Sequence, residues 1–431
     1  MAEISPFRAL RYDPAAAPLA DLVTQPYDKI TPRMQERYYA ASPYNFVRLV
    51  LGKKQEGDDE RRNLYTRAAE SYCEWRRRGI LRPDPEPALY AYSQRFPVPS
   101  GNGERERTGF IALVRLEDYD RGIICRHERT LTAPKADRLN LLQATAAQFE
   151  PLFLLYSDPR RELEPRLRSA RAPDSEVRDE YGALHRLWKV SDREEIEFIR
   201  NRMEEKKLLI ADGHHRYETA LEYRNRMRDR AGGAAAEAPW ERAMVALFPM
   251  ESDGLVILPT HRVLSGLENF HTEDLVRGAQ AYFEVNASGR EMEPQQILAL
   301  LAAAGKEGPA LAAVTSGGVF LLRARAGAAD RLLAGVSSRQ RGLDVVLLHK
   351  ILIEQVLGIS EEAVRDERHL AYVRDAAEAL ARVQSGANAA FLMNPARIEQ
   401  VRDLAFAGEV LPQKSTDFYP KLLSGLTIYE H

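Results

Sequence analysis

The sequence has little cysteine. Its 431 residues include only Cys73 and Cys125, which excludes a disulfide framework and favours a reducing compartment such as the cytoplasm. No stretch approaches the roughly 18 consecutive apolar residues of a membrane-spanning helix. The first residues also lack the basic and apolar segments of a signal peptide. We therefore expect a cytoplasmic protein with no membrane partner.

Several familiar catalytic motifs are also missing. The chain has no phosphate-binding G-x-x-x-x-G-K-[ST] loop, no G-x-G-x-x-G after a strand, no G-x-S-x-G, no C-x-x-C and no H-E-x-x-H. A familiar NTPase, dehydrogenase, hydrolase or zinc enzyme is therefore not indicated. The formal net charge is −2, whereas a nucleic-acid-binding protein usually has a basic surplus. The balance argues against a nucleic-acid partner.

Length and pattern indicate a multidomain α/β protein. Hydrophobic residues make up 45% and charged residues 29%, which is typical of globular proteins, and the length favours two or three domains. Strand-like and helix-like segments mix along the chain, so we expect an α/β class fold (α+β, with mixed sheets). We divide it into an N-terminal region (1–104), a core (105–265) with an insertion near 157–195, and a C-terminal α/β region (266–431).

Three segments of the first half illustrate the expected elements. Thr31 and Pro32 predict a helix through Ala41, with Thr31 as its cap. The apolar run 46–51 predicts a strand. Residues 160–190 are highly charged and predict irregular structure.

One stretch, residues 208–221, concentrates polar groups at a turn. Leu208 to Ala211 form an apolar run typical of a buried strand, and from residue 215 apolar positions recur at helical spacing. Between them lie the polar residues and the glycine of the turn, Asp212, Gly213, His214, His215 and Arg216. A helix start offers backbone N–H groups and the positive end of a dipole. The turn is therefore a candidate site for phosphate, with Asp212 as a metal ligand or base beside it.

Structural explanations of the same residues remain open. Asp212 alone is compatible with a helix N-cap, and a single histidine with polar cover of a helix start. Four chemically active residues within five favour function. A zinc site is disfavoured because adjacent histidines on a helix point about 100° apart.

Other polar clusters occur far from this turn in sequence. His127, Glu128 and Arg129 follow a strand-like run, His261 and Arg262 follow another, and Lys414, Ser415 and Thr416 come late in the chain. Phosphoryl transfer to a hydroxyl needs a phosphate cradle, cations, a Mg²⁺ ligand and a carboxylate that accepts the hydroxyl proton. We expect Glu128 as base, Asp212 on the metal or orienting His214, and residues 213–216 on the phosphates.

The chain resembles a known family over nearly its full length. The matching segments are PFR at 6–8, QPYD at 25–28, PYNFVRL at 43–49, HERTLTAPKADRL, ADGHHRYETAL, LPTHRV and KSTDFYPKLLSGL. They resemble a widespread bacterial and archaeal family of uncharacterised proteins, a domain of unknown function numbered 1015. This resemblance does not itself imply an activity.

Part of the chain also resembles the free serine kinases of the ParB/sulfiredoxin-like fold. Those enzymes share the His-Glu pair, a strand that leads into Asp-Gly-His-His-Arg, and a late Lys-Thr/Ser-Thr segment. The resemblance implies a ParB/sulfiredoxin-like catalytic core, Glu128 as catalytic base and 212–216 as the site for Mg²⁺ and the phosphates of ATP or ADP. It also implies contact of 414–416 with an amino-acid substrate. This chain departs from the pattern in its longer separation of the motifs and in its first hundred residues.

We therefore expect a small-molecule kinase whose acceptor is free L-serine, giving O-phosphoserine, or a similar hydroxy compound. A sulfiredoxin-like reaction would need a cysteine in the phosphate turn, where this chain has histidines. One alternative is a ParB-like DNA-associated protein, which predicts a helix-turn-helix module and basic surfaces. The other is a nucleotide-binding regulator, which would keep 212–216 and tolerate the loss of Glu128.

Overall fold

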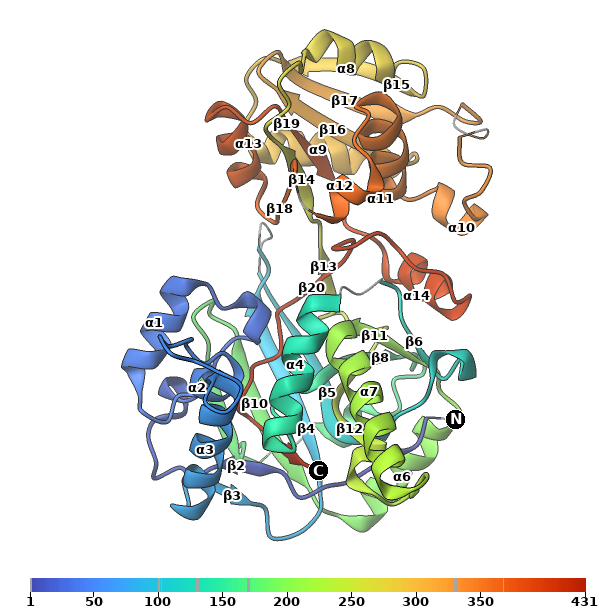
Figure 1. Ribbon diagram of the computed structural model, residues 1–431. Coiled ribbons are helices and arrows are strands. Elements are labelled where there is room, and N and C mark those ends of the chain that lie inside the picture. Colours follow the sequence, from blue (N-terminus) through green and yellow to red (C-terminus); the bar gives the residue numbers. More distant parts are fainter. Residues whose placement is uncertain are drawn as a thin grey trace. The chain divides into compact units, whose positions relative to one another are not determined.

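The chain forms two compact units. The computed structural model describes residues 2–99, 101, 103–128, 132–168, 171–328, 330, 332–366 and 368–431, without the side chains of 132–134 and 365. The first unit comprises Met1–Arg126, Thr130–Val256 and Phe418–His431, and the second comprises His127–Arg129 and Ile257–Asp417. Each unit is thus assembled from segments that are distant in sequence (Figure 1).

A mixed sheet forms the core of the first unit. Its strands are β1 (Ile4–Ser5), β4 (Leu89–Pro97), β5 (Glu104–Arg115), β6 (Ile124–Cys125), β8 (Leu152–Tyr156), β9 (Ser175–Arg178), β10 (Leu184–Val190), β11 (Leu208–Asp212) and β12 (Arg242–Pro249). Over the described residues these nine strands follow the order β6-β11-β8-β12-β5-β4-β10-β9, with β1 paired to β5. The pairs β6–β11 and β8–β12 are parallel and the others antiparallel.

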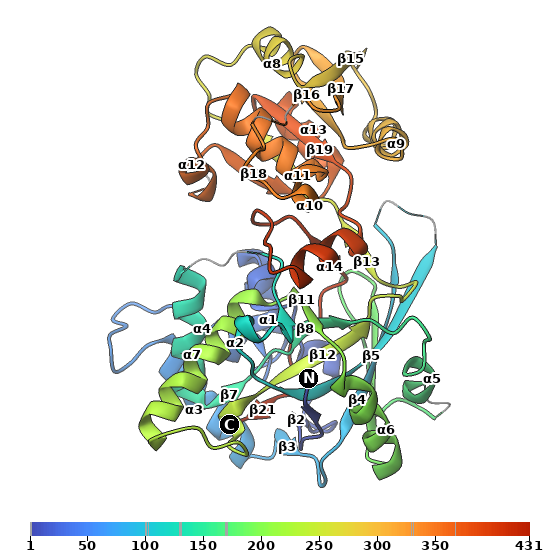
Figure 2. The same cartoon turned by 90° about the vertical axis from the view of Figure 1, so that its right-hand side faces the viewer.

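Helices pack on this sheet and beside it. They are α1 (Pro32–Ala41), α2 (Val47–Val50), α3 (Leu64–Arg77), α4 (Thr132–Thr145), α5 (Glu164–Leu167), α6 (Arg193–Glu204) and α7 (His214–Ala231). Helices α4 and α7 lie side by side in both Figure 1 and Figure 2, and α3 packs on α4. Two small ladders join β2 (Leu10–Tyr12) to β3 (Leu81–Pro83) and β7 (Ala147–Gln148) to β21 (Tyr429–Glu430). Leu208 and Ile210 of β11 pack with Tyr217 and Ala220 of α7 in one core, which fixes the turn between the two elements.

The last residues of the chain are an integral part of the first unit. Arg107 is fully buried and donates hydrogen bonds to the carbonyl oxygens of Tyr419 (3.2 Å) and Pro420 (2.5 Å). Its guanidinium carbon lies 4.6 Å from the ring centre of Phe153. The backbone groups of Ser424 exchange hydrogen bonds with those of Thr24 at 2.9 and 3.1 Å. Both ends of the chain therefore contribute to the same unit.

An antiparallel sheet forms the second unit. Its strands are β14 (His261–Leu264), β15 (Phe283–Gly289), β16 (Ala310–Thr315), β17 (Gly318–Ala324), β18 (Leu370–Val373) and β19 (Ala389–Met393). Within the described residues the order is β15-β17-β16-β19-β14-β18. Two further short strands, β13 (Val256–Leu258) and β20 (Asp417–Tyr419), span points where the chain passes from one unit to the other.

Helices pack on both faces of the second sheet. They are α8 (Thr272–Ala279), α9 (Pro294–Gly305), α10 (Ser338–Arg341), α11 (Asp344–Leu347), α12 (Glu361–Arg365), α13 (Ala376–Gln384) and α14 (Ile398–Phe406), and a π-helix (Leu348–Val356) continues α11. Helices α9 and α13 share one apolar cluster with the sheet. Helix α8 and the α11/π-helix segment share another. The two clusters show that the sheet is covered on both sides.

The structure confirms the mixed α/β class and corrects local expectations. Helix α1 is capped by Thr31, whose Oγ1 accepts a hydrogen bond from Met34 N at 3.3 Å. The strand expected at 46–51 is wrong, because this segment contains helix α2, whose Val47 N–H donates to Asn45 Oδ1 at 3.0 Å. The irregular structure expected at 160–190 is also wrong, because β9 and β10 pair there. The division at 104/105 and 265/266 stays a prediction.

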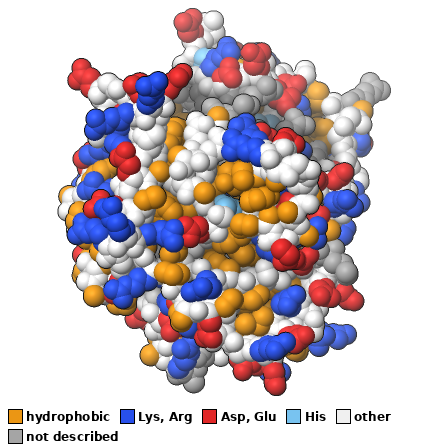
Figure 3. Space-filling view, turned by 60° about the horizontal axis from the view of Figure 1, so that its bottom comes forward, with side chains coloured by type: hydrophobic (Ala, Val, Ile, Leu, Met, Phe, Trp, Pro, Cys, Tyr) orange, Lys and Arg blue, Asp and Glu red, His pale blue; other side chains and the backbone are white. Residues whose placement is uncertain are grey.

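Helix hydropathy, the two cysteines and the surface charge can be compared with the expectations from the sequence. No helix within the described ranges is both long and apolar enough to cross a bilayer. Cys73 and Cys125 are free thiols. On the face seen in Figure 3, positive and negative side chains are interspersed around a central group of hydrophobic ones, so this face carries no field of a single sign.

Candidate functional site

The turn at 212–216 has the predicted strand-to-helix geometry. Strand β11 ends at Asp212, Gly213 is the N-cap, and α7 begins at His214. Gly213 has φ of 92°, a left-handed conformation that favours glycine. A Cβ at this position would also lie 3.0 Å from two guanidinium nitrogens of Arg216. Glycine therefore permits both the turn and the close position of the Arg216 side chain.

Two cations flank the carboxylate of Asp212. Arg216 Nη2 lies 3.4 Å from Asp212 Oδ2, and Lys421 Nζ lies 3.6 Å from Asp212 Oδ1. Burial alone would raise the pKa of Asp212, but Lys421, Arg216 and Lys29 outweigh it and hold the pKa well below its ordinary value. Asp212 is therefore ionised at neutral pH. We call Lys29, Asp212, Arg216 and Lys421 the Asp212 cluster.

The Pro-Tyr-Asp motif near the start of the chain reaches this cluster. Tyr27 N donates to Glu150 Oε1 at 3.0 Å, and Ser424 Oγ donates to the same oxygen at 2.9 Å. The next residue along, Pro151, accepts a hydrogen bond from Arg216 Nη1 at 2.8 Å through its carbonyl oxygen. Buried Glu150 thus links the N-terminal motif to the C-terminal segment directly beside Arg216.

The surroundings of His215 favour its neutral form. His214 is buried. Burial lowers the pKa of His215, although Glu218 and Asp28 oppose this effect, so its imidazole is neutral at pH 7. His215 can therefore offer a hydrogen bond to a ligand, while Arg216, Lys421 and Lys29 supply positive charge beside Asp212. Glu218, one turn further along α7, forms ion pairs with Arg126 (3.1 Å) and Lys135 (3.4 Å).

A second cluster of predicted residues forms in the second unit. His127 O accepts a hydrogen bond from Leu411 N at 2.7 Å, and Glu128 Oε1 accepts one from Lys414 N at 2.8 Å. His127 is fully buried, and its Nε2 lies 2.7 Å from Thr416 Oγ1. The structure therefore brings together the His-Glu pair and the late Lys-Ser-Thr segment, which are distant in sequence.

Arg262 stabilises the same segment. It is fully buried, and its Nη2 donates to the carbonyl oxygens of Gln413 (3.2 Å) and Lys414 (3.1 Å). The guanidinium carbon of Arg262 and Nζ of Lys414 lie 4.7 and 4.2 Å from the ring centre of Tyr372. Burial lowers the pKa of Arg262 to about 10. We call His127, Glu128, Arg262, Lys414 and Thr416 the Glu128 cluster.

The remaining predicted residues have other surroundings. His261 is buried in β14, where Nδ1 accepts a hydrogen bond from Met393 N at 3.3 Å, and burial lowers its pKa to about 4. It therefore satisfies a backbone group of the neighbouring strand β19. Ser415 Oγ donates to Pro412 O at 2.5 Å, and Ser415 lines a pocket of the second unit. Arg129 lies outside the described residues.

Sequence reasoning assigned no role to Lys29, Glu150 or Lys421. Lys29 directly follows the Pro-Tyr-Asp motif, and Lys421 lies within the KSTDFYPKLLSGL segment. Both segments belong to motifs that are visible in the sequence, and this is the signal that points to them. Neither segment is near residue 212 in sequence. Only the tertiary structure therefore shows which of their residues lie close to Asp212.

Comparisons with known proteins give one family and distant structural likenesses. The model of a family described as "Protein of unknown function (DUF1015)" matches residues 4–346. The search of curated proteins gave no match. A mutant free serine kinase in complex with ADP is 14% identical, with a TM-score of 0.37 over 77% of this chain and 98% of that one.

Two further solved structures are similarly distant. A conserved hypothetical protein from Pyrococcus furiosus has 15% identity and a TM-score of 0.36, covering 74% of this chain and 94% of that one. SbnI with a C-terminal truncation, from Staphylococcus aureus, has 11% identity and a TM-score of 0.35, covering 73% and 85%. TM-scores in this range do not establish a common fold.

Proposed function

This chain belongs to the DUF1015 family of proteins of unknown function, and we propose that it is a nucleotide-dependent kinase. It transfers a phosphoryl group to the hydroxyl of a small molecule, for which free L-serine is the first acceptor to test. The proposal rests on the motifs that resemble those of free serine kinases and on the geometry of the Asp212 cluster.

The observation that carries the proposal is the convergence of three cations on the start of α7. Lys29, Arg216 and Lys421 come from three separate parts of the chain and surround one ionised carboxylate, Asp212. Helix α7 has 18 residues, so its N-terminus carries the positive end of a full helix dipole. Cations at a helix N-terminus suit the phosphates of a nucleotide.

Asp212 is the carboxylate of the Asp212 cluster that could bind Mg²⁺. Among the described residues there is no group of three or more His, Cys, Asp or Glu side chains that could hold a metal ion. Mg²⁺ in phosphoryl-transfer sites commonly takes one or two carboxylates and completes its shell with water and substrate phosphates. Asp212 fits that limited role, and bound Mg²⁺ would neutralise charge on the phosphates.

The reaction itself needs few groups from the protein. The acceptor hydroxyl oxygen bonds to the terminal phosphorus of the nucleotide while the bridging P–O bond breaks, and the shortened nucleotide leaves with that oxygen. The hydroxyl proton passes to a carboxylate, a role that the resemblance gives to Glu128. Arg216 and the lysines hold negative charge on the phosphate oxygens. The backbone hydrogen bond from Lys414 fixes the orientation of the Glu128 carboxylate.

Phosphorus NMR tests the proposal directly. The purified full-length chain is incubated with Mg²⁺, either ATP or ADP, and L-serine, and then with a panel of other hydroxy acids. A new phosphomonoester signal that requires both nucleotide and acceptor is the expected result, and the donor that gives it separates ATP from ADP. Tight nucleotide binding without an ester for any acceptor would contradict the kinase and favour a nucleotide-binding regulator.

A further inference from the structure

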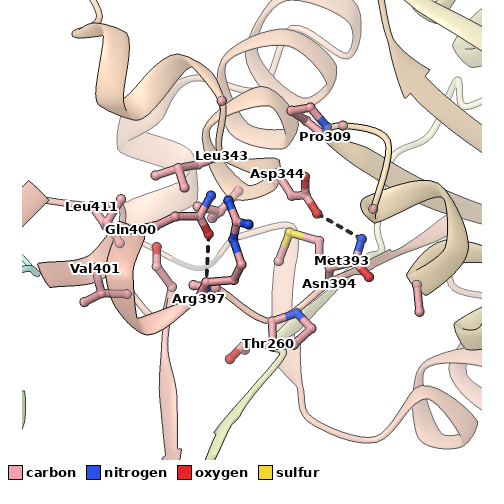
Figure 4. A pocket seen from close by; sticks show the side chains of 18 of the residues that line it. Thr260, Pro309, Leu343, Asp344, Met393, Asn394, Arg397, Gln400, Val401 and Leu411 are labelled. Carbon is pink, nitrogen blue, oxygen red and sulfur yellow. Dashed lines mark hydrogen bonds between the residues drawn. The ribbon is translucent and has the colours of Figure 1, made fainter. Parts of the chain in front are cut away.

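The second unit contains a pocket outside both clusters. Its volume is about 530 Å³, within the range of small-molecule sites. The pocket lies where the end of β19, the loop after α9, the start of α11 and the start of α14 meet (Figure 4). We call it the Asp344 pocket. All of its lining residues belong to the second unit.

One wall of the pocket presents a carboxyl group held in place by amides. Asp344 Oδ1 accepts a hydrogen bond from Ala310 N at 3.1 Å, and Oδ2 accepts one from Asn394 Nδ2 at 3.3 Å. Asn394 Nδ2 also donates to Leu301 O at 3.3 Å. A Cβ on residue 305 would lie 2.6 Å from Asn394 Nδ2. Glycine at this position therefore leaves room for the Asn394 side chain beside α9. The wall is therefore fixed before any ligand arrives.

Asp344 has no cationic partner among the residues that the structure describes. Burial raises its pKa to about 6, so it is still mostly ionised above neutral pH. A partly buried carboxylate is costly unless a cation pairs with it. A ligand ammonium would remove that cost.

Cationic side chains line the same pocket. Arg397 directly precedes α14 and Lys306 directly follows α9, and both side chains are exposed. Across the described ranges, neither forms an ion pair with an acidic residue. Gln400 is held by the Arg397 backbone, whose N–H donates to Gln400 Oε1 at 3.0 Å. Such cations suit a carboxylate on the ligand.

The rest of the lining is apolar and well packed. Leu343, Val401 and Leu411 are at most 4% exposed, and Met393 lies beside them. Figure 4 shows Asp344 and Asn394 joined by their hydrogen bond, with Leu343, Leu411 and Val401 in another part of the lining. An apolar surface of this kind favours an apolar ligand body over water.

We propose that the Asp344 pocket binds a free amino acid with an apolar side chain. Its ammonium group pairs with Asp344, its carboxylate binds Arg397 and Lys306, and its side chain packs on the apolar lining. This assignment goes beyond the proposed kinase and does not depend on it, because the ligand needs no hydroxyl and no nucleotide.

Isothermal titration calorimetry on the full-length chain, without nucleotide, tests the assignment. The probes are L-leucine, L-methionine and L-phenylalanine, with isocaproate and leucinamide as leucine analogues that lack the amine or the carboxylate. At least one amino acid is expected to bind with Kd below about 1 mM, and isocaproate and leucinamide are expected to bind at least about tenfold more weakly than that amino acid. No binding by any of the three amino acids, or equal binding of the analogues, would overturn the proposal.

Variants locate the binding within the molecule. Arg397→Ala is expected to raise Kd about tenfold, and because Arg397 is exposed the variant retains its fold. Arg402→Ala is the matched control, since Arg402 lies on α14 and pairs with Asp403 at 2.8 Å outside the pocket lining. Asp344→Asn is expected to weaken binding similarly. Amino-acid binding that is unchanged in both Arg397→Ala and Asp344→Asn would overturn the assignment to this pocket.

Discussion

Lys421 Nζ lies 3.6 Å from Asp212 Oδ1, although the two residues are distant in sequence. Lys421 is buried, with its side chain 8% exposed, so solvent screens this pair only weakly. The contact makes the C-terminal segment a component of the candidate phosphate site. Replacing Lys421 is therefore a direct test of whether the Asp212 cluster binds phosphate.

Replacement of Lys421 should weaken nucleotide binding. Lys421→Met keeps the apolar stem and removes the charge, so the Kd for ATP or ADP is expected to rise about tenfold, a loss of ~1.4 kcal/mol. Lys189→Met is the control, because Lys189 pairs with Glu86 at 3.7 Å elsewhere in the first unit. Calorimetry measures both variants. Equal nucleotide affinity in the two would remove Lys421 from the site.

Glu128→Gln should separate chemistry from binding. The glutamine oxygen still accepts the hydrogen bond of Lys414 N but cannot take the hydroxyl proton, so the rate of ester formation should fall by about 10²–10⁴-fold. The nucleotide Kd should stay within about twofold of wild type. The measurement is the initial rate in phosphorus NMR together with calorimetry. Retained turnover would exclude Glu128 as the base.

Gly213 and Gly232 form a matched pair at the two ends of α7. Both have positive φ, 92° at Gly213 and 75° at Gly232. A Cβ added at Gly213 would contact the Arg216 side chain, whereas a Cβ added at Gly232 would have no described non-neighbouring atom within 4 Å. Gly213→Ala and Gly232→Ala should each cost about 1–2 kcal/mol of stability. Only Gly213→Ala should also weaken nucleotide binding, because Arg216 must move. Chemical denaturation and calorimetry compare the variants, and parallel losses of affinity would contradict the cradle.

Asp344 should leave a signature in the pH dependence of stability. Its pKa is about 6 in the folded chain, raised by burial from an ordinary 3.8. Between these values the folded state binds a proton that the unfolded state has released, so stability from this group falls as pH rises from about 4 to about 6. The full effect amounts to about 3 kcal/mol.

Asp344→Asn removes this titration. The free energy of unfolding of wild type minus that of the variant should therefore decrease from pH 4 to pH 7. Urea denaturation at several pH values provides the measurement, and Asp403→Asn, an exposed carboxylate on α14, serves as the control. A difference that is constant with pH would show that Asp344 titrates normally.

The central turn could be predicted because its signals are local. The change from an apolar run to helical spacing at Gly213 appears directly in the sequence, and the structure has β11 and α7 on either side of it. The mixed α/β class was predictable for the same reason. The helix at 47–50 was missed because the side chain of Asn45 stabilises a helix start that apolar periodicity does not reveal.

The contacts of the clusters were not predictable in this way. Lys29, Glu150 and Lys421 meet near residue 212 only through the fold, and no spacing rule relates their positions. His261 and Arg262 were recognised as a polar pair after a strand, but only the structure separates their roles. Buried His261 bonds to a backbone N–H, while Arg262 supports the Lys414 segment.

The return of residues 418–431 to the first unit has a consequence for synthesis of the protein. Translation proceeds from the N-terminus, so the ribosome makes Asp212, then nearly all of the second unit, and only then Lys421. Until residues 418–431 leave the exit tunnel, the nascent first unit lacks the segment whose carbonyl oxygens accept hydrogen bonds from Arg107. A nucleotide site that depends on Lys421 is therefore completed only after the second unit has been synthesised.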